Sequence, residues 1–142
     1  MEKLIDNIVE QAKERFAEQV LPFLKEQGEK LLKKVKTDLI PVLKDFLGKI
    51  QKAGNSDIVY RLVPSLSQSY IVELAGKNIV RGANQVVAVK NIKDGKTFVY
   101  LSYAKDRELL EENDNRFIVI EADSVEDDVN DLFGNESLII LE

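Results

Sequence analysis

The opening stretch, MEKLIDNIVEQAKERFAEQVLPFLKEQGEKLLKKVKTDLIPVLKDFLGKIQKA (residues 1–53), decides the fold. Its apolar residues recur at steps of three and four, the spacing that gathers side chains into one stripe on an α-helix. One stripe runs from Leu4 to Val20, and a second runs from Leu31 to Ile50. On a single straight helix the two stripes would lie roughly on opposite sides. The stretch therefore breaks between them or is covered on two sides.

Two prolines mark where such breaks are expected. Pro22 and Pro41 lack an amide hydrogen and bias the preceding residue away from helix. Thr37 and Asp38 can cap a new helix that has Pro41 in its first turn, whereas no good cap precedes Pro22, which favours a kink there. We predict amphipathic helical segments near 2–20, 22–36 and 38–52.

The pattern changes after residues 54–57, Gly-Asn-Ser-Asp. Beyond them, alternating β-branched and aromatic residues replace the helical period. We therefore predict an α+β protein with a helical segment (1–53) and an α+β domain (57–142). The domain should hold a mixed, mostly antiparallel sheet and two short helices near the C-terminus. Strands are expected at 58–63, 70–75, 79–81, 86–92, 97–103, 117–121 and 138–141, and the helices at 104–112 and 124–134.

The strands at 86–92 and 97–103 give the clearest pairing. Asp94-Gly95 between them is a strong signal for a two-residue hairpin turn, because that turn needs positive φ at both positions. The resulting register places large apolar residues on both faces, so we expect layers on both sides of this hairpin. One face should carry Val86, Ala88, Val99, Leu101 and Tyr103, and the other Val87, Val89, Phe98 and Tyr100.

Composition excludes several kinds of chemistry. The 142 residues include no cysteine and no histidine. This removes disulfides, thiolate and imidazole metal ligands, Ser-His-Asp and Cys-His catalysis, and the usual general base near neutral pH. No apolar run is long enough to cross a bilayer, and the first residues do not resemble a signal peptide. We expect a cytoplasmic protein without a cofactor.

Charge is distributed unevenly between the two parts. Residues 1–53 carry eleven basic and nine acidic side chains, whereas the remainder carries nine basic and sixteen acidic ones. The acidic remainder would repel nucleic acid, so we expect no nucleic-acid partner. The acidic run around Asp123, Asp127 and Asp131 does not have the spacing of a calcium loop, and a solvated helix face explains it without a metal. Lys30, Lys33, Lys34 and Lys36 form the one basic cluster.

These observations favour a non-enzymatic interaction or regulatory module. The opening helices have more apolar surface than water tolerates, so they should self-associate or bind a protein partner. An alternative is peripheral binding to a lipid surface through the proline-punctuated amphipathic helices. A second alternative is a small enzyme that uses carboxylates or a metal. The predicted partner-binding residues are Ile8, Phe16, Leu32, Val35, Leu43 and Phe46.

Overall fold

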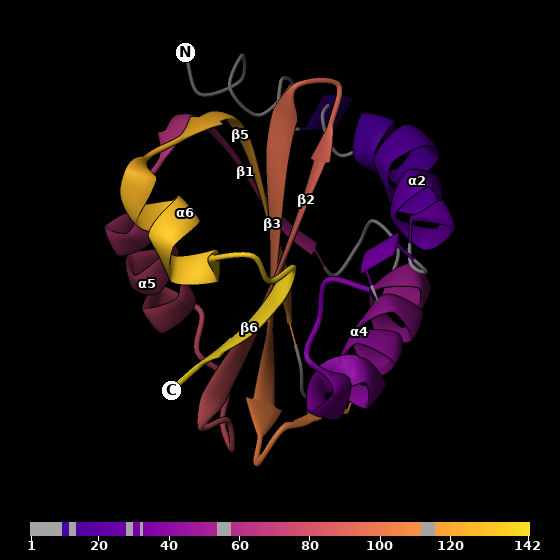
Figure 1. Cartoon of the computed structure of the whole chain (residues 1–142), viewed down its shortest axis with the longest axis vertical. Helices are drawn as coiled ribbons and strands as arrows, with labels where there is room; N and C mark the ends of the chain where they lie inside the picture. Colours follow the sequence, from indigo (N-terminus) through magenta and orange to yellow (C-terminus); the bar gives the residue numbers. More distant parts are fainter. Residues whose placement is uncertain (1–9, 12–13, 28–29, 32, 54–57, 112–115) are drawn as a thin grey trace.

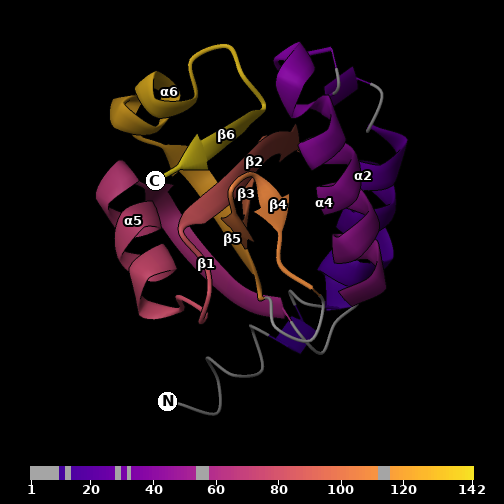
Figure 2. The ribbon, with the colours of Figure 1, turned by 90° about the horizontal axis from the view of Figure 1, so that it is seen from below.

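The computed structural model describes residues 10–11, 14–27, 30–31, 33–53, 58–111 and 116–142. They form a mixed α+β fold in which helices cover both faces of a central sheet (Figures 1 and 2). Helices α2 (Leu21–Glu26) and α4 (Ile40–Ala53) lie on one face, and α5 (Gln68–Lys77) and α6 (Asp127–Phe133) lie on the other. The predicted α+β class is confirmed.

The sheet has six strands and is mixed, as predicted. Five of them are arranged in the order β1-β5-β3-β2-β6, and β4 pairs with β3. The β1–β5 pair is parallel and the other pairs are antiparallel. The strands are β1 (Ile58–Leu66), β2 (Gln85–Lys93), β3 (Lys96–Lys105), β4 (Glu108–Leu109), β5 (Phe117–Val125) and β6 (Leu138–Leu141).

The hairpin of β2 and β3 has the predicted register. Lys93 pairs with Lys96 across Asp94-Gly95, whose φ angles are 54° and 78°. Both faces of the hairpin are buried, and each face carries the residues predicted for it. Val87, Val89, Phe98 and Tyr100 belong to the core beneath α2 and α4, and Ala88, Val99, Leu101 and Tyr103 belong to the core beneath α5 and α6.

The leading helices differ from the prediction in number and length. A π-helical turn, η1 (Phe16–Val20), runs into α2, whose second residue is Pro22. Proline cannot donate to the carbonyl four residues earlier, and a π turn is one way a helix accommodates such a defect. A 3₁₀ turn, η2 (Thr37–Leu39), then precedes α4 and has no side-chain cap. Within the described residues α4 is the one long helix, so the predicted series of three amphipathic helices is not confirmed.

Helix α4 packs one side against the sheet. Val42, Leu43, Phe46 and Ile50 are buried, whereas Lys44 and Asp45 are exposed. The Phe46 ring meets Phe117 of β5 edge-on, with ring centroids 5.5 Å apart. Residues of 1–53 and of the sheet thus share one hydrophobic core. The predicted division at 54–57 stays a prediction, because those residues lie outside the described part.

The strand predicted at 70–75 is wrong, because this stretch is helix α5. The Ser67 hydroxyl accepts a hydrogen bond from the Tyr70 amide and caps the helix. Ile71, Leu74 and Ala75 are buried at helical spacing, whereas Val72 is exposed. A short apolar run fits the period of a helix or of a strand. Here the cap at Ser67 favours the helix. Residues 79–81 are likewise not a strand, since they form a loop and the start of a turn.

The helix predicted at 104–112 is also wrong. Strand β3 continues to Lys105, turns at Asp106 and Arg107 with φ of 51° and 70°, and returns as β4. Leu109 pairs with Ala104 and is buried in the core beneath α4, which favours the hairpin over local helix propensity. The later helix is confirmed as α6, but it begins at Asp127 with no side-chain cap, because Ser124 still belongs to β5.

Strand β1 runs through Pro64, where the sequence predicts its end. Ser65 and Leu66 continue the pairing with β5, opposite Ser124 and Val125. In the described sheet β1 has a neighbour on one side only. Proline is tolerated in such an edge strand, because its missing donor can face away from the ladder.

Candidate functional site

An open pocket of about 780 Å³ lies at the edge of β2 where β6 stops. Strand β6 pairs only with residues 86–89 of β2, so Lys90, Asn91 and Ile92 lie beyond its end and line the pocket. The opposite wall comes from α2 and the segment after it, and the third wall is the turn after α6. Its volume lies within the range of pockets that bind small molecules, roughly 300–1,000 Å³.

Main-chain hydrogen bonds hold these three walls together at Ser137. The Ser137 amide donates to the Lys34 carbonyl, and the Lys90 amide donates to the Ser137 carbonyl, both at 2.9 Å. Ser137 itself is buried. The two lysines are therefore fixed at their backbones on either side of one residue, although they are 56 positions apart in the sequence.

Gly134 shapes the third wall. It ends α6 with φ of 58° and ψ of −127°, a conformation that side chains disfavour. Its amide donates to the Asn130 carbonyl at 2.8 Å, and the Glu136 amide donates to the Phe133 carbonyl at 3.0 Å. The helix ends at this glycine, as predicted. The turn that follows directs the chain toward Lys34 and Lys90.

The pocket is lined by four lysines and one carboxylate, that of Glu136. Within the described part of the chain, none of these lysines forms an ion pair. Burial, and then the nearby charge of Lys34, lower the pKa of the Lys90 ammonium group. The Lys90 amine lies 5.2 Å from the centroid of the Phe133 ring. The four lysines are Lys30, Lys33, Lys34 and Lys90.

Beside the pocket, Asn91 holds a buried donor without a partner among the described residues. Its Oδ1 accepts a 2.6 Å hydrogen bond from the Tyr100 hydroxyl on the neighbouring strand. Its Nδ2 is buried and is the one buried side-chain polar atom of the described residues without a hydrogen-bond partner. Only 7% of Asn91 is exposed. Burying an amide donor without a partner costs about 1–3 kcal/mol, and this donor has no surface open to the pocket.

Apolar side chains complete the pocket. Phe23 and Leu31 come from the helical layer, and Ile92 comes from β2 with 62% of its surface exposed. The Lys93 amine lies 5.5 Å from the centroid of the Phe23 ring, which links α2 to β2 beside the pocket. The pocket therefore combines an apolar wall with a positively charged end.

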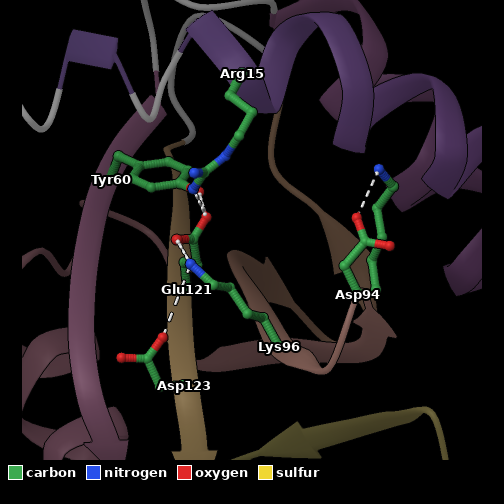
Figure 3. A network of polar contacts seen from close by, with 7 residues as sticks. Arg15, Tyr60, Asp94, Lys96, Glu121 and Asp123 are labelled. Carbon is green, nitrogen blue, oxygen red and sulfur yellow. Dashed lines mark hydrogen bonds and ion pairs between the residues drawn. The ribbon is translucent and has the colours of Figure 1, made fainter.

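A second polar cluster, centred on Glu121 of β5, has a different character (Figure 3). The Glu121 carboxylate is 4% exposed and accepts hydrogen bonds from Arg15, Tyr60 and Lys96. Lys96 also lies 3.8 Å from Asp123. Each charge in this cluster has an opposite charge beside it. The cluster joins the helical layer to the sheet and presents no unpaired group to a ligand.

The cluster also shifts two pKa values. Burial alone would raise the pKa of Glu121, but hydrogen bonds from Arg15 and Tyr60 outweigh it, and the pKa is lower than usual. Burial, reinforced by the hydrogen bond to Glu121, raises the pKa of Tyr60. Glu121 is thus held ionised and Tyr60 neutral. In the described part of the chain, no group of three or more acidic side chains is placed to hold a metal ion.

The predicted partner-binding residues lie elsewhere. Phe16, Val35, Leu43 and Phe46 are all buried in the core between the helices and the sheet. Ile8 and Leu32 lie outside the described residues. Where it is described, the apolar surface of the leading helices is therefore buried against the chain's own sheet. Association through these four side chains would require the helices to leave the sheet, and it stays a prediction.

Sequence reasoning identified the basic cluster but missed the pocket. Lys30, Lys33 and Lys34 were visible as a group, whereas Lys90 and Asn91 lie in a strand read only for its packing. An asparagine next to Val87 and Val89 on one face of the strand was the available signal, because both of those neighbours belong to the apolar core. Comparisons with protein-family models, curated proteins and solved structures find no match to this chain.

Proposed function

We propose that the protein is a non-enzymatic binding module with a regulatory role and that its binding surface is the pocket at the edge of β2. The observation that carries this proposal is a pocket of ligand size lined by four lysines without an ion-pair partner among the described residues. Uncompensated charge of one sign in a cleft attracts ligands of the opposite sign.

The side chains of the pocket support binding rather than catalysis. Glu136 is its one carboxylate, so the described lining offers no pair of acidic groups for acid and base roles. The chain has no histidine or cysteine that could act as base or nucleophile. Positive charge, amide donors and an apolar wall are the usual means of holding a small ligand.

Of the two other functions suggested by the sequence, self-association is less well supported. Self-association through the helices would use Phe16, Leu43 and Phe46, which already pack in the protein's own core. For lipid binding, Lys30, Lys33 and Lys34 are the relevant cations, and they lie on the pocket. No described helix is long and apolar enough to cross a membrane.

A ligand screen followed by amide NMR tests the proposal. The full chain, labelled with ¹⁵N, is mixed with a library of small anionic, neutral and cationic compounds. We expect at least one class of compound to shift the amides of Lys90 and Ser137 together, because both donate hydrogen bonds at the pocket wall. If compounds bind and shift amides only elsewhere, or if no compound binds, the pocket is not the binding surface.

A further inference from the structure

We propose that the pocket binds an organic phosphate, with the phosphate group held between the ammonium groups of Lys34 and Lys90. The proposal rests on the proposed function and names its ligand. The organic part would lie against Phe23, Leu31 and Ile92, the apolar wall of the same pocket.

The charge of the pocket calls for a multiply charged anion. Four lysines and one glutamate give the lining a formal charge of +3. Lys34 and Lys90 are near enough for the charge of one to lower the pKa of the other. A phosphate monoester carries between one and two negative charges near neutral pH and offers three acceptor oxygens. It would bridge the two ammonium groups and remove their repulsion, which a single carboxylate does less completely.

The size and the apolar wall indicate more than inorganic phosphate. A volume of about 780 Å³ is far larger than one phosphate group needs. Ile92 is 62% exposed beside the charged end, and an organic group over it would shield it from water. The same chemistry occurs in dissolved organic phosphates and in the headgroups of phospholipids, and the experiment separates these sources.

The experiment measures binding of defined probes to the full chain. Phenyl phosphate and benzyl alcohol are titrated by calorimetry and amide NMR. Flotation is measured with phosphatidylcholine vesicles that contain or lack phosphatidic acid. We expect phenyl phosphate to bind at least tenfold more tightly than benzyl alcohol. Flotation only with phosphatidic acid, without binding of phenyl phosphate, would assign the site to a lipid headgroup. Binding of phenyl phosphate assigns it to dissolved ligands.

Matched variants locate the binding. Lys34→Gln and Lys90→Gln should each weaken phosphate binding about tenfold, because each removes one charged hydrogen-bond donor. The double variant Lys34→Gln/Lys90→Gln removes both cations, so binding should disappear. Lys44→Gln, on the exposed side of α4, is the control and should change affinity less than twofold. Circular dichroism checks that each variant is folded.

Several results would overturn the proposal. Equal affinity for phenyl phosphate and benzyl alcohol would exclude recognition of the phosphate. Binding that survives both lysine variants and the double variant would place it outside this pocket. Failure of all probes, vesicles included, would also overturn it. If the compound library nevertheless shows a cationic or neutral ligand at the pocket, the proposed function stands and only the phosphate assignment falls.

Discussion

The Tyr60 hydroxyl donates a 2.7 Å hydrogen bond to the carboxylate of Glu121, and both side chains are buried. Tyr60 belongs to β1 and Glu121 to β5, the one parallel pair of the sheet. Arg15 donates to the same carboxylate oxygen from the helical layer. The contact therefore ties together two strands and the segment that covers them.

Tyr60→Phe should lower the free energy of unfolding by about 1–3 kcal/mol, because it removes a hydrogen bond to a buried charge. Tyr70→Phe is the matched control, since Tyr70 is only partly buried and its hydroxyl has no partner among the described residues. Urea unfolding of both variants measures the difference. Equal effects at the two positions would mean that the Tyr60 hydroxyl contributes no more than an ordinary surface hydroxyl.

Stability should depend on the protonation of Glu121. Its pKa is lower in the folded protein than the ordinary value of 4.5, so ionised Glu121 stabilises the fold at higher pH. This contribution is fully present above the unfolded pKa and is lost as the pH falls through the folded pKa. Arg15→Met removes the main hydrogen bond that lowers this pKa, so the variant should lose stability at a higher pH than the original chain.

Unfolding free energies measured from neutral pH downward test this shift for Arg15→Met. Arg81→Met, at an exposed turn position, serves as the control and should follow the curve of the original chain. If the Arg15 variant and the original chain lose stability over the same pH range, Arg15 does not set the pKa of Glu121.

Phe46→Ala should cost about 3–5 kcal/mol, the usual range for deleting a fully buried aromatic ring. The ring meets Phe117 edge-on and is central to the contact between α4 and the sheet. Val72→Ala, at an exposed position of α5, should change stability by about 0.5 kcal/mol or less. Thermal and urea unfolding of both variants measure these losses. A small loss for Phe46→Ala would show that α4 contributes little to the fold.

A chain that begins at residue 57 should aggregate. Without residues 1–56, Val87, Val89, Phe98 and Tyr100 lose the layer that covers them. Exposed apolar patches of this kind drive association. Light scattering of the shortened and full-length chains gives their masses in solution. A shortened chain that stays monomeric would mean that residues 57–142 form an independent domain and that the helices are not needed to cover the sheet.

The sequence was informative where the spacing of its apolar residues and its turn residues predicted the same structure. Asp94-Gly95 predicted the β2–β3 register, including which residues face each core, because both turn positions need positive φ. It misled at 70–75, where a short apolar run fits either period and Ser67 acts as the deciding cap. At 104–112, helix propensity was overridden by pairing of Leu109 with Ala104. That pairing is favoured by the burial of Leu109 in the core beneath α4, a tertiary contact that leaves no local signal.

The candidate site was hidden for the same reason. Its basic cluster is contiguous in the sequence, but Lys90, Asn91 and Ser137 join it only through the sheet. The predicted partner-binding residues were chosen because apolar helix surface needs cover. That reasoning identified buried residues such as Phe16 and Phe46, but it could not tell that the cover is the chain's own sheet.

The titration of the Lys90 amine, followed by NMR with and without phenyl phosphate, tests the central claim most directly. We predict that Lys90 loses its proton at a lower pH than an ordinary lysine side chain, because burial and Lys34 lower its pKa, and that phenyl phosphate raises the pKa of Lys90. If Lys90 titrates like an ordinary lysine and phenyl phosphate leaves its pKa unchanged, this pocket does not bind an anion at Lys90.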